Sequence, residues 1–151
     1  MNKKIKSSIM PTYGERDLEF VKGKDCYLLT SDGKKYLDFA GGIAVNSLGH
    51  CHPKLVKALK KQAETLWHTS NLYYNQNQEE YASMLCKNSF ADKVFFTNSG
   101  SEAIECGIKV VRSYWHYHKK NRKKIITFEG AFHGRTFGAI SAQKNTKYSK
   151  E

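Results

Sequence analysis

Small polar residues stand where a predicted buried strand passes into a predicted helix, at residues 97–101 with the sequence TNSGS. The first N–H groups of a helix have no acceptor within the helix and carry its positive dipole end, so they bind anions readily. Gly100 would let the backbone approach a phosphate closely, and Ser99 or Ser101 could add a hydroxyl donor. A plain helix cap is the alternative, because Ser99 and Glu102 have the spacing of a capping box. These residues alone leave both interpretations open, although they match neither the GxxxxGK[ST] nor the GxGxxG nucleotide loop.

A second stretch, EGAFHGRT at residues 129–136, follows another predicted strand at 125–128. Ligands of open parallel sheets bind outside the carboxyl ends of the strands, so Phe132, His133 and Arg135 are expected near the same edge as residues 99–101. A phosphate cradle, an aromatic ring and an arginine together could hold a planar phosphorylated cofactor and a carboxylate substrate. The combination of the two stretches favours an anion site over a plain cap.

The hydrophobic pattern predicts the elements that position these stretches. Strands are expected at 18–21, 26–29, 36–39, 93–97 and 125–128, and helices at 54–66, 77–88 and 100–118. The first strands form an antiparallel hairpin around the turn at 31–34. The strand, helix and strand from 93 to 128 form a βαβ unit, which implies a parallel sheet. The predicted class is α/β, with an antiparallel segment at 1–52 and the first part of a larger domain at 53–151. Because two parallel strands leave sheet edges uncovered, the chain is expected to be incomplete.

Composition bounds the possible functions. The 151 residues are enough for one domain with a core. No apolar run approaches the roughly 20 residues of a membrane span, and the amino-terminal residues lack the apolar part of a secretory signal, so a cytoplasmic protein without a membrane partner is expected.

The net charge of +11 raises the possibility of a nucleic-acid partner. Only four of the 25 basic residues are arginines, and the lysines are spread along the chain. Base recognition favours arginine, and single-strand binding favours aromatic residues interleaved with the charge, so no nucleic-acid partner is predicted. The densest cluster, at 118–124, is interpreted as a solvated helix end, with a basic contact surface as the alternative.

Cysteine and histidine spacing gives little support for a metal. The four cysteines form no CxxC pair. The run His50-Cys51-His52 contains ligand types, but neighbours on an extended chain point in opposite directions and no second pair is suitably spaced. No metal site is predicted.

The paired stretches TNSGSEAIE, at 97–105, and GAFHGRT, at 130–136, resemble the class III, or ω-amino-acid, aminotransferases that depend on pyridoxal phosphate (PLP). The similarity runs from about Ile9 to Tyr148. The stretch at 10–53 and HTSNLYYN at 68–75 narrow the resemblance to the branch that acts on N-acetylornithine. It implies a fold-type I architecture, of which this chain would form the amino-terminal part.

The resemblance also implies roles for individual residues. Gly100 and Ser101 match positions that hold the cofactor phosphate, and Phe132 matches the aromatic residue that stacks on the pyridine ring. Arg135 matches the arginine that binds the substrate α-carboxylate. Ile43 falls where enzymes for free ornithine have a tyrosine, which favours the acetylated donor.

No catalytic residue is expected in this chain, since the family's Schiff-base lysine and its pyridinium-pairing aspartate have no counterpart here. The 151 residues alone are therefore expected to be inactive.

The implied activity transfers the δ-amino group of N-acetylornithine to 2-oxoglutarate in arginine biosynthesis, in a protein that is a homodimer at full length. Other class III donors, namely ornithine, succinylornithine or 4-aminobutyrate, remain alternatives. A non-catalytic basic binding protein is the alternative from a different class.

Overall fold

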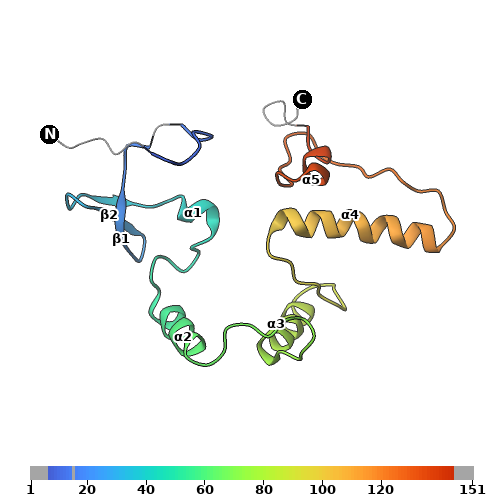
Figure 1. The fold of residues 1–151 in the computed structure, drawn as a ribbon, viewed down its shortest axis with the longest axis horizontal. Helices are drawn as coiled ribbons and strands as arrows, with labels where there is room; N and C mark the ends of the chain where they lie inside the picture. The colour runs from blue at the N-terminus through green and yellow to red at the C-terminus, as the bar shows by residue number, and fades with distance from the viewer. Residues whose placement is uncertain (1–6, 15, 145–151) are drawn as a thin grey trace. The chain divides into compact units, whose positions relative to one another are not determined.

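The computed structural model describes residues 7–14 and 16–144, and the chain divides into two compact units, the first ending at Tyr73 and the second beginning at Tyr74 (Figure 1). The expected division into segments 1–52 and 53–151 stays a prediction.

The first unit contains a three-stranded antiparallel sheet in the order β1-β2-β3. Its strands are β1 (Phe20–Lys24), β2 (Tyr27–Thr30) and β3 (Lys35–Leu37). In the β1–β2 hairpin Lys24 lies opposite Tyr27 and Phe20 opposite Thr30, with an irregularity between Phe20 and Lys22. The antiparallel pairing of β2 with β3 confirms the hairpin predicted around the turn at 31–34, and β1 confirms the strand predicted before it.

The turn between β2 and β3 is held by local polar contacts. Gly33 has a φ of 83°, which a glycine adopts without strain, and its N–H donates to the Thr30 carbonyl at 3.0 Å. The Lys34 ammonium lies 2.9 Å from the Asp32 carboxylate, and the Thr30 hydroxyl also donates to it. These two contacts lower the pKa of Asp32 to about 2.

Two helices follow the sheet in this unit. The short helix α1 (Gly41–Ala44), with Gly42 and Ile43 at positive φ, was not predicted from the sequence. Helix α2 (Pro53–Ala63) confirms the helix predicted at 54–66 and begins with proline at its first position, where the missing N–H costs no hydrogen bond.

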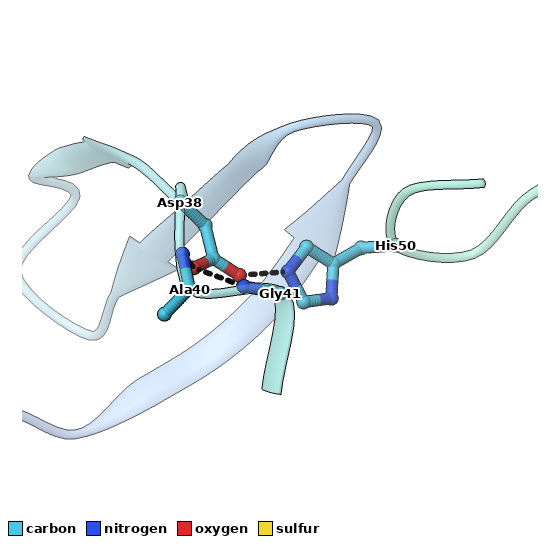
Figure 2. A network of polar contacts seen from close by, with 4 residues as sticks. All are labelled: Asp38, Ala40, Gly41 and His50. Carbon is cyan, nitrogen blue, oxygen red and sulfur yellow. Dashed lines mark hydrogen bonds and ion pairs between the residues drawn. The ribbon is translucent and has the colours of Figure 1, made fainter. Parts of the chain in front are cut away.

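A partly buried contact between Asp38 and His50 closes the segment between β3 and α2 (Figure 2). The His50 Nε2 atom lies 2.7 Å from Asp38 Oδ2, and the two side chains are 18% and 9% exposed. The other Asp38 oxygen accepts the backbone N–H groups of Ala40 and Gly41 at 2.9 and 3.0 Å. His50 is also bridged to Asp25 of the β1–β2 turn through both backbone groups, at 2.7 and 3.1 Å. Asp38 and His50 thus fasten both ends of the 38–50 segment to the sheet.

The contact with Asp38 explains the position of His50. The sequence analysis considered His50 as a metal ligand and rejected it. Among residues 7–14 and 16–144, no group of three His, Cys, Asp or Glu side chains could hold a metal ion.

The second unit is helical (Figure 1). Helix α3 (Gln76–Lys87) begins at Asn75, whose side chain accepts the Gln78 N–H at 3.1 Å, and α4 (Gly100–Tyr117) is the longest element. These bounds agree within one residue with the helices predicted at 77–88 and 100–118. The five-residue helix α5 (Phe137–Ser141) was not predicted.

The strands predicted at 93–97 and 125–128 do not form within the described residues, where both segments lack sheet pairing. A segment becomes a strand only when a neighbour pairs with its N–H and C=O groups, and apolar patterning supplies no such neighbour. Helix α4 is therefore flanked by two unpaired segments rather than by strands of a parallel sheet.

The described part of the chain buries few residues. Its buried residues are Thr30, Gly134, Ala139 and Gln143, whereas Ile126 and Phe128 are largely exposed. The core expected from chain length is therefore absent from the described residues, because elements bury their apolar faces only where a second layer covers them. No described helix has the length and apolar character that crossing a membrane requires.

The contacts of Asp38 predict that the order of the 38–50 segment depends on pH. The His50 ring, and then the Gly41 N–H, lower the pKa of Asp38 below its ordinary value of about 3.9. The ionised carboxylate therefore stabilises the closed segment above that value, and this stabilisation is lost as the pH falls through the lowered pKa. In an NMR titration the amide shifts of Ala40 and Gly41 should change with a midpoint below about 3.9.

Two variants test which contacts lower the pKa of Asp38. His50→Ala removes the largest contribution, so the midpoint should rise, and Asp38→Asn should abolish the transition. A midpoint at or above the ordinary value in the unsubstituted chain would contradict this description of the pair.

Candidate functional site

The amino terminus of α4 is capped by Ser99 and remains open at Gly100. The Ser99 Oγ atom accepts the Glu102 N–H at 3.2 Å, and the Glu102 carboxylate accepts the Asn98 N–H at 2.7 Å. A Cβ atom placed on Gly100 would meet nothing within 4 Å in the described part of the chain. Ser99 therefore serves as the cap, while Gly100 and Ser101 leave the helix end accessible to an anion. The helix cap and the anion site, the two interpretations of residues 97–101, are therefore compatible.

The loop that contains Phe132 and Arg135 returns to the same end of α4. The Arg135 N–H donates to Ser101 Oγ at 3.1 Å. One turn further along α4, Glu105 Oε1 accepts the Thr136 hydroxyl at 2.6 Å and the Gly138 N–H at 3.0 Å. At the start of the loop, the His133 N–H donates to the Gln143 side chain at 2.8 Å. The loop is therefore fastened at several points around Arg135.

Two glycines make this close approach possible. Gly134 has a φ of 130°, and a Cβ atom there would overlap the Ser101 hydroxyl and lie 2.8 Å from Ser101 Cβ. A Cβ atom on Gly138 would overlap the Glu105 carboxylate and lie 2.7 Å from its Cδ. The contact between the loop and α4 thus leaves no room for larger side chains at these positions.

A hollow of about 750 Å³ lies between the two stretches. Its size is within the range of about 300–1,000 Å³ found for small-molecule sites. Its lining contains all four predicted site residues, namely Gly100, Ser101, Phe132 and Arg135, together with Ser99, Ala103, Ile104, His133 and Gly134. The structure therefore brings the four residues together, while their individual roles stay predictions.

Glu105 was missed by the sequence analysis. The Thr136 hydroxyl, followed by the N–H groups of Gly138 and Ala139, lowers the pKa of its carboxyl group. The available signal was its spacing, because residues four apart on a helix share one face and Glu105 follows Ser101 by four. No local sequence pattern predicts that Thr136 and Gly138 bind Glu105.

The opposite end of α4 carries the basic cluster. A hollow of about 690 Å³ there is lined by Arg112, Trp115, His116, Lys119, Lys120, Asn121, Arg122 and Lys123. The Arg122 guanidinium lies 4.5 Å from the centre of the Trp115 ring and covers one of its faces, where a nucleotide base would otherwise stack. At 1.5 Å per residue, the 18 residues of α4 separate the two ends by about 27 Å. The absence of a nucleic-acid partner stays a prediction.

Comparison with known proteins identifies the class to which this arrangement belongs. Residues 10–151 match the sequence model of the family described as Aminotransferase class-III, so the chain belongs to the class-III aminotransferase family.

Relatives and solved structures narrow the similarity. Acetylornithine aminotransferase of Agrobacterium fabrum is 55% identical over 142 residues, which cover 93% of this chain and 35% of that protein. The crystal structure of N-acetylornithine aminotransferase from Stenotrophomonas maltophilia matches with a TM-score of 0.73 and 37% identity, over 86% of this chain and 35% of that one. Ornithine aminotransferase from Toxoplasma gondii matches with a TM-score of 0.83 and 27% identity, over 94% and 34% of the two chains.

These matches confirm the predicted fold class, which is that of the fold-type I transaminases. The antiparallel sheet of β1 to β3 is the amino-terminal segment of that fold. The chain spans about a third of the length of the relatives that it matches.

Proposed function

We propose that these residues belong to a PLP-dependent transaminase that moves the δ-amino group of N-acetylornithine to 2-oxoglutarate, a step of arginine biosynthesis. The products are N-acetylglutamate semialdehyde and glutamate. The observation that carries the proposal is the bond from the Arg135 N–H to the Ser101 hydroxyl, which joins a carboxylate-binding residue to an anion-binding helix end. The names of the relatives at about 55% identity support the choice of donor.

The residues around the hollow fit PLP. The N–H groups at the start of α4 and the Ser101 hydroxyl can bind a phosphate dianion, since Ser101 accepts the Arg135 N–H and keeps its own proton for donation. Gly100 leaves the space for close approach, and the Phe132 ring is 62% exposed. When bound, PLP would supply the chemistry that takes an amino group from one substrate and gives it to the next.

The side chains of this chain then have distinct tasks. Phe132 would cover one face of the cofactor ring and exclude water from it. Arg135 would bind a substrate carboxylate through its two-pronged guanidinium. The α-carboxylate of N-acetylornithine and the distal carboxylate of 2-oxoglutarate lie at a similar distance along the carbon chain from the reacting carbon, so one arginine can orient the amino donor and the acceptor in turn.

The proposal assigns catalysis to residues outside this chain. None of its lysines stands in the family's Schiff-base context, so the 151 residues alone are proposed to be inactive. The full-length protein, meaning a protein of the relatives' length that contains these residues, is proposed to be a cytoplasmic homodimer. Ornithine, succinylornithine and 4-aminobutyrate are the donors that a substrate panel should include.

The first test of the proposal is Gly100→Val in the full-length protein. A side chain at this position would fill the space that the phosphate needs, so the affinity for PLP should fall by at least about tenfold. Gly107→Val is the matched control, because a Cβ atom there also meets nothing within 4 Å in the described residues and lies two turns from the helix end. Titration with PLP measures both variants. Retention of full affinity by Gly100→Val would mean that residues 99–101 act only as a cap.

A second test is Arg135→Ala in the same protein. Charge-assisted hydrogen bonds contribute roughly 1.5–3 kcal/mol each, so kcat/KM for N-acetylornithine should fall by at least about tenfold. The affinity for PLP should barely change. Arg112→Ala, at the far end of α4, is the control and should leave kcat/KM unchanged. Loss of PLP affinity in Arg135→Ala, with PLP affinity retained in Gly100→Val, would show that the two stretches have been assigned the wrong way round.

A further inference from the structure

Glu105 binds the loop of Arg135 without reaching the hollow itself. It lies one turn after Ser101 on α4, and its Oε1 atom accepts the Thr136 hydroxyl at 2.6 Å and the Gly138 N–H at 3.0 Å. It is absent from the residues that line the hollow between the two stretches. Glu105 therefore contacts the loop rather than a ligand in that hollow.

The contacts of Glu105 and Ser101 enclose Arg135 from both sides. Ser101 holds the N–H of Arg135 itself, and Glu105 holds the residues one and three positions later. Gly134, immediately before Arg135, rests against Ser101 with no room for a Cβ atom. A backbone fixed at these points gives the Arg135 side chain a defined starting direction, which reduces the conformational entropy lost on binding.

Electrostatics favour the same arrangement. The three donors from Thr136, Gly138 and Ala139 lower the pKa of the Glu105 carboxyl group, so it is ionised throughout the neutral range. An ionised carboxylate offers only acceptors, and the loop offers only donors to it.

We propose that Glu105 is a positioning residue that aims Arg135 at the α-carboxylate of the substrate. The inference rests on the proposed function and deepens it. It predicts that Glu105 controls discrimination between amino donors that carry an α-carboxylate and those that do not. Cofactor binding at Gly100 and Ser101 does not depend on it.

The test compares two donors in the full-length protein loaded with PLP. N-acetylornithine carries the α-carboxylate, whereas N-acetylputrescine has the same amine and acetyl group without it. In Glu105→Ala, kcat/KM for N-acetylornithine should fall at least about tenfold, mainly through KM, while kcat/KM for N-acetylputrescine should change less than about twofold. A general loss of folding or of cofactor would lower both values together.

Substitutions at Thr136 test the same bond from its other end. Thr136→Val keeps the shape and removes the hydroxyl donor, so it should lower the ratio of the two kcat/KM values in the same direction as Glu105→Ala. Thr136→Ser restores the donor and should recover most of the ratio. The two Thr136 variants still test the bond between Glu105 and Thr136 if Glu105→Ala does not fold.

Glu129→Gln is the matched control, because Glu129 is 80% exposed and is ion-paired only at the surface with Lys144. Such pairs contribute little, so both kcat/KM values should remain unchanged.

The outcomes separate the two proposals. If the unsubstituted protein transaminates N-acetylornithine but Glu105→Ala and Thr136→Val leave the donor ratio unchanged, or slow both donors equally, the positioning role is wrong and the proposed function stands. If the unsubstituted protein transaminates no donor of the panel, the proposed function fails and the inference fails with it.

Discussion

The contact between α4 and the segment from Gly134 to Gly138 is the constraint on which the candidate site depends. Two side chains one helical turn apart, Ser101 and Glu105, accept three hydrogen-bond donors from a segment more than 30 residues further along the chain. Without those bonds, the open helix end at Gly100 and the guanidinium of Arg135 would have no fixed relation to each other. With them, the residues proposed to bind a phosphate and a carboxylate line one hollow.

In the first unit, too, polar contacts hold a loop in place. Asp38 and His50 fasten the 38–50 segment to the sheet in a part of the molecule where few apolar side chains are buried. Hydrogen bonds to charged groups are stronger than those between neutral groups, so a few well-placed ones can order a loop that has little core beneath it. In both units, aspartate or glutamate oxygens accept backbone N–H groups that would otherwise lack partners.

The sequence predicted those features that short-range patterns determine. Helical spacing and caps placed α2, α3 and α4, and alternating residues with a turn placed the antiparallel hairpin. The residues Gly100, Ser101, Phe132 and Arg135 were found from their types, from their positions after predicted strands and from the resemblance to the class III aminotransferases. They lie together because both stretches meet at one end of α4.

Features that depend on distant partners were not predicted. The stretches 93–97 and 125–128 have the composition of strands, but strand formation requires a neighbour that no local pattern specifies. Glu105 looks like any solvent-facing acid of a helix until Thr136 and Gly138 are placed against it. The sequence analysis rejected His50 as a metal ligand but did not predict its partner, Asp38. Single-turn helices such as α1 and α5 are too short to produce a periodic signal.

Amide hydrogen exchange at single-residue resolution, in the full-length protein, tests the central claim most directly. Addition of PLP should slow exchange at the amides of Gly100 and Ser101, because the phosphate accepts hydrogen bonds from the start of α4. Subsequent addition of 2-oxoglutarate should slow exchange in the loop around Arg135. Unchanged exchange at Gly100 and Ser101, with protection by PLP at the basic cluster of residues 118–124 instead, would contradict the account.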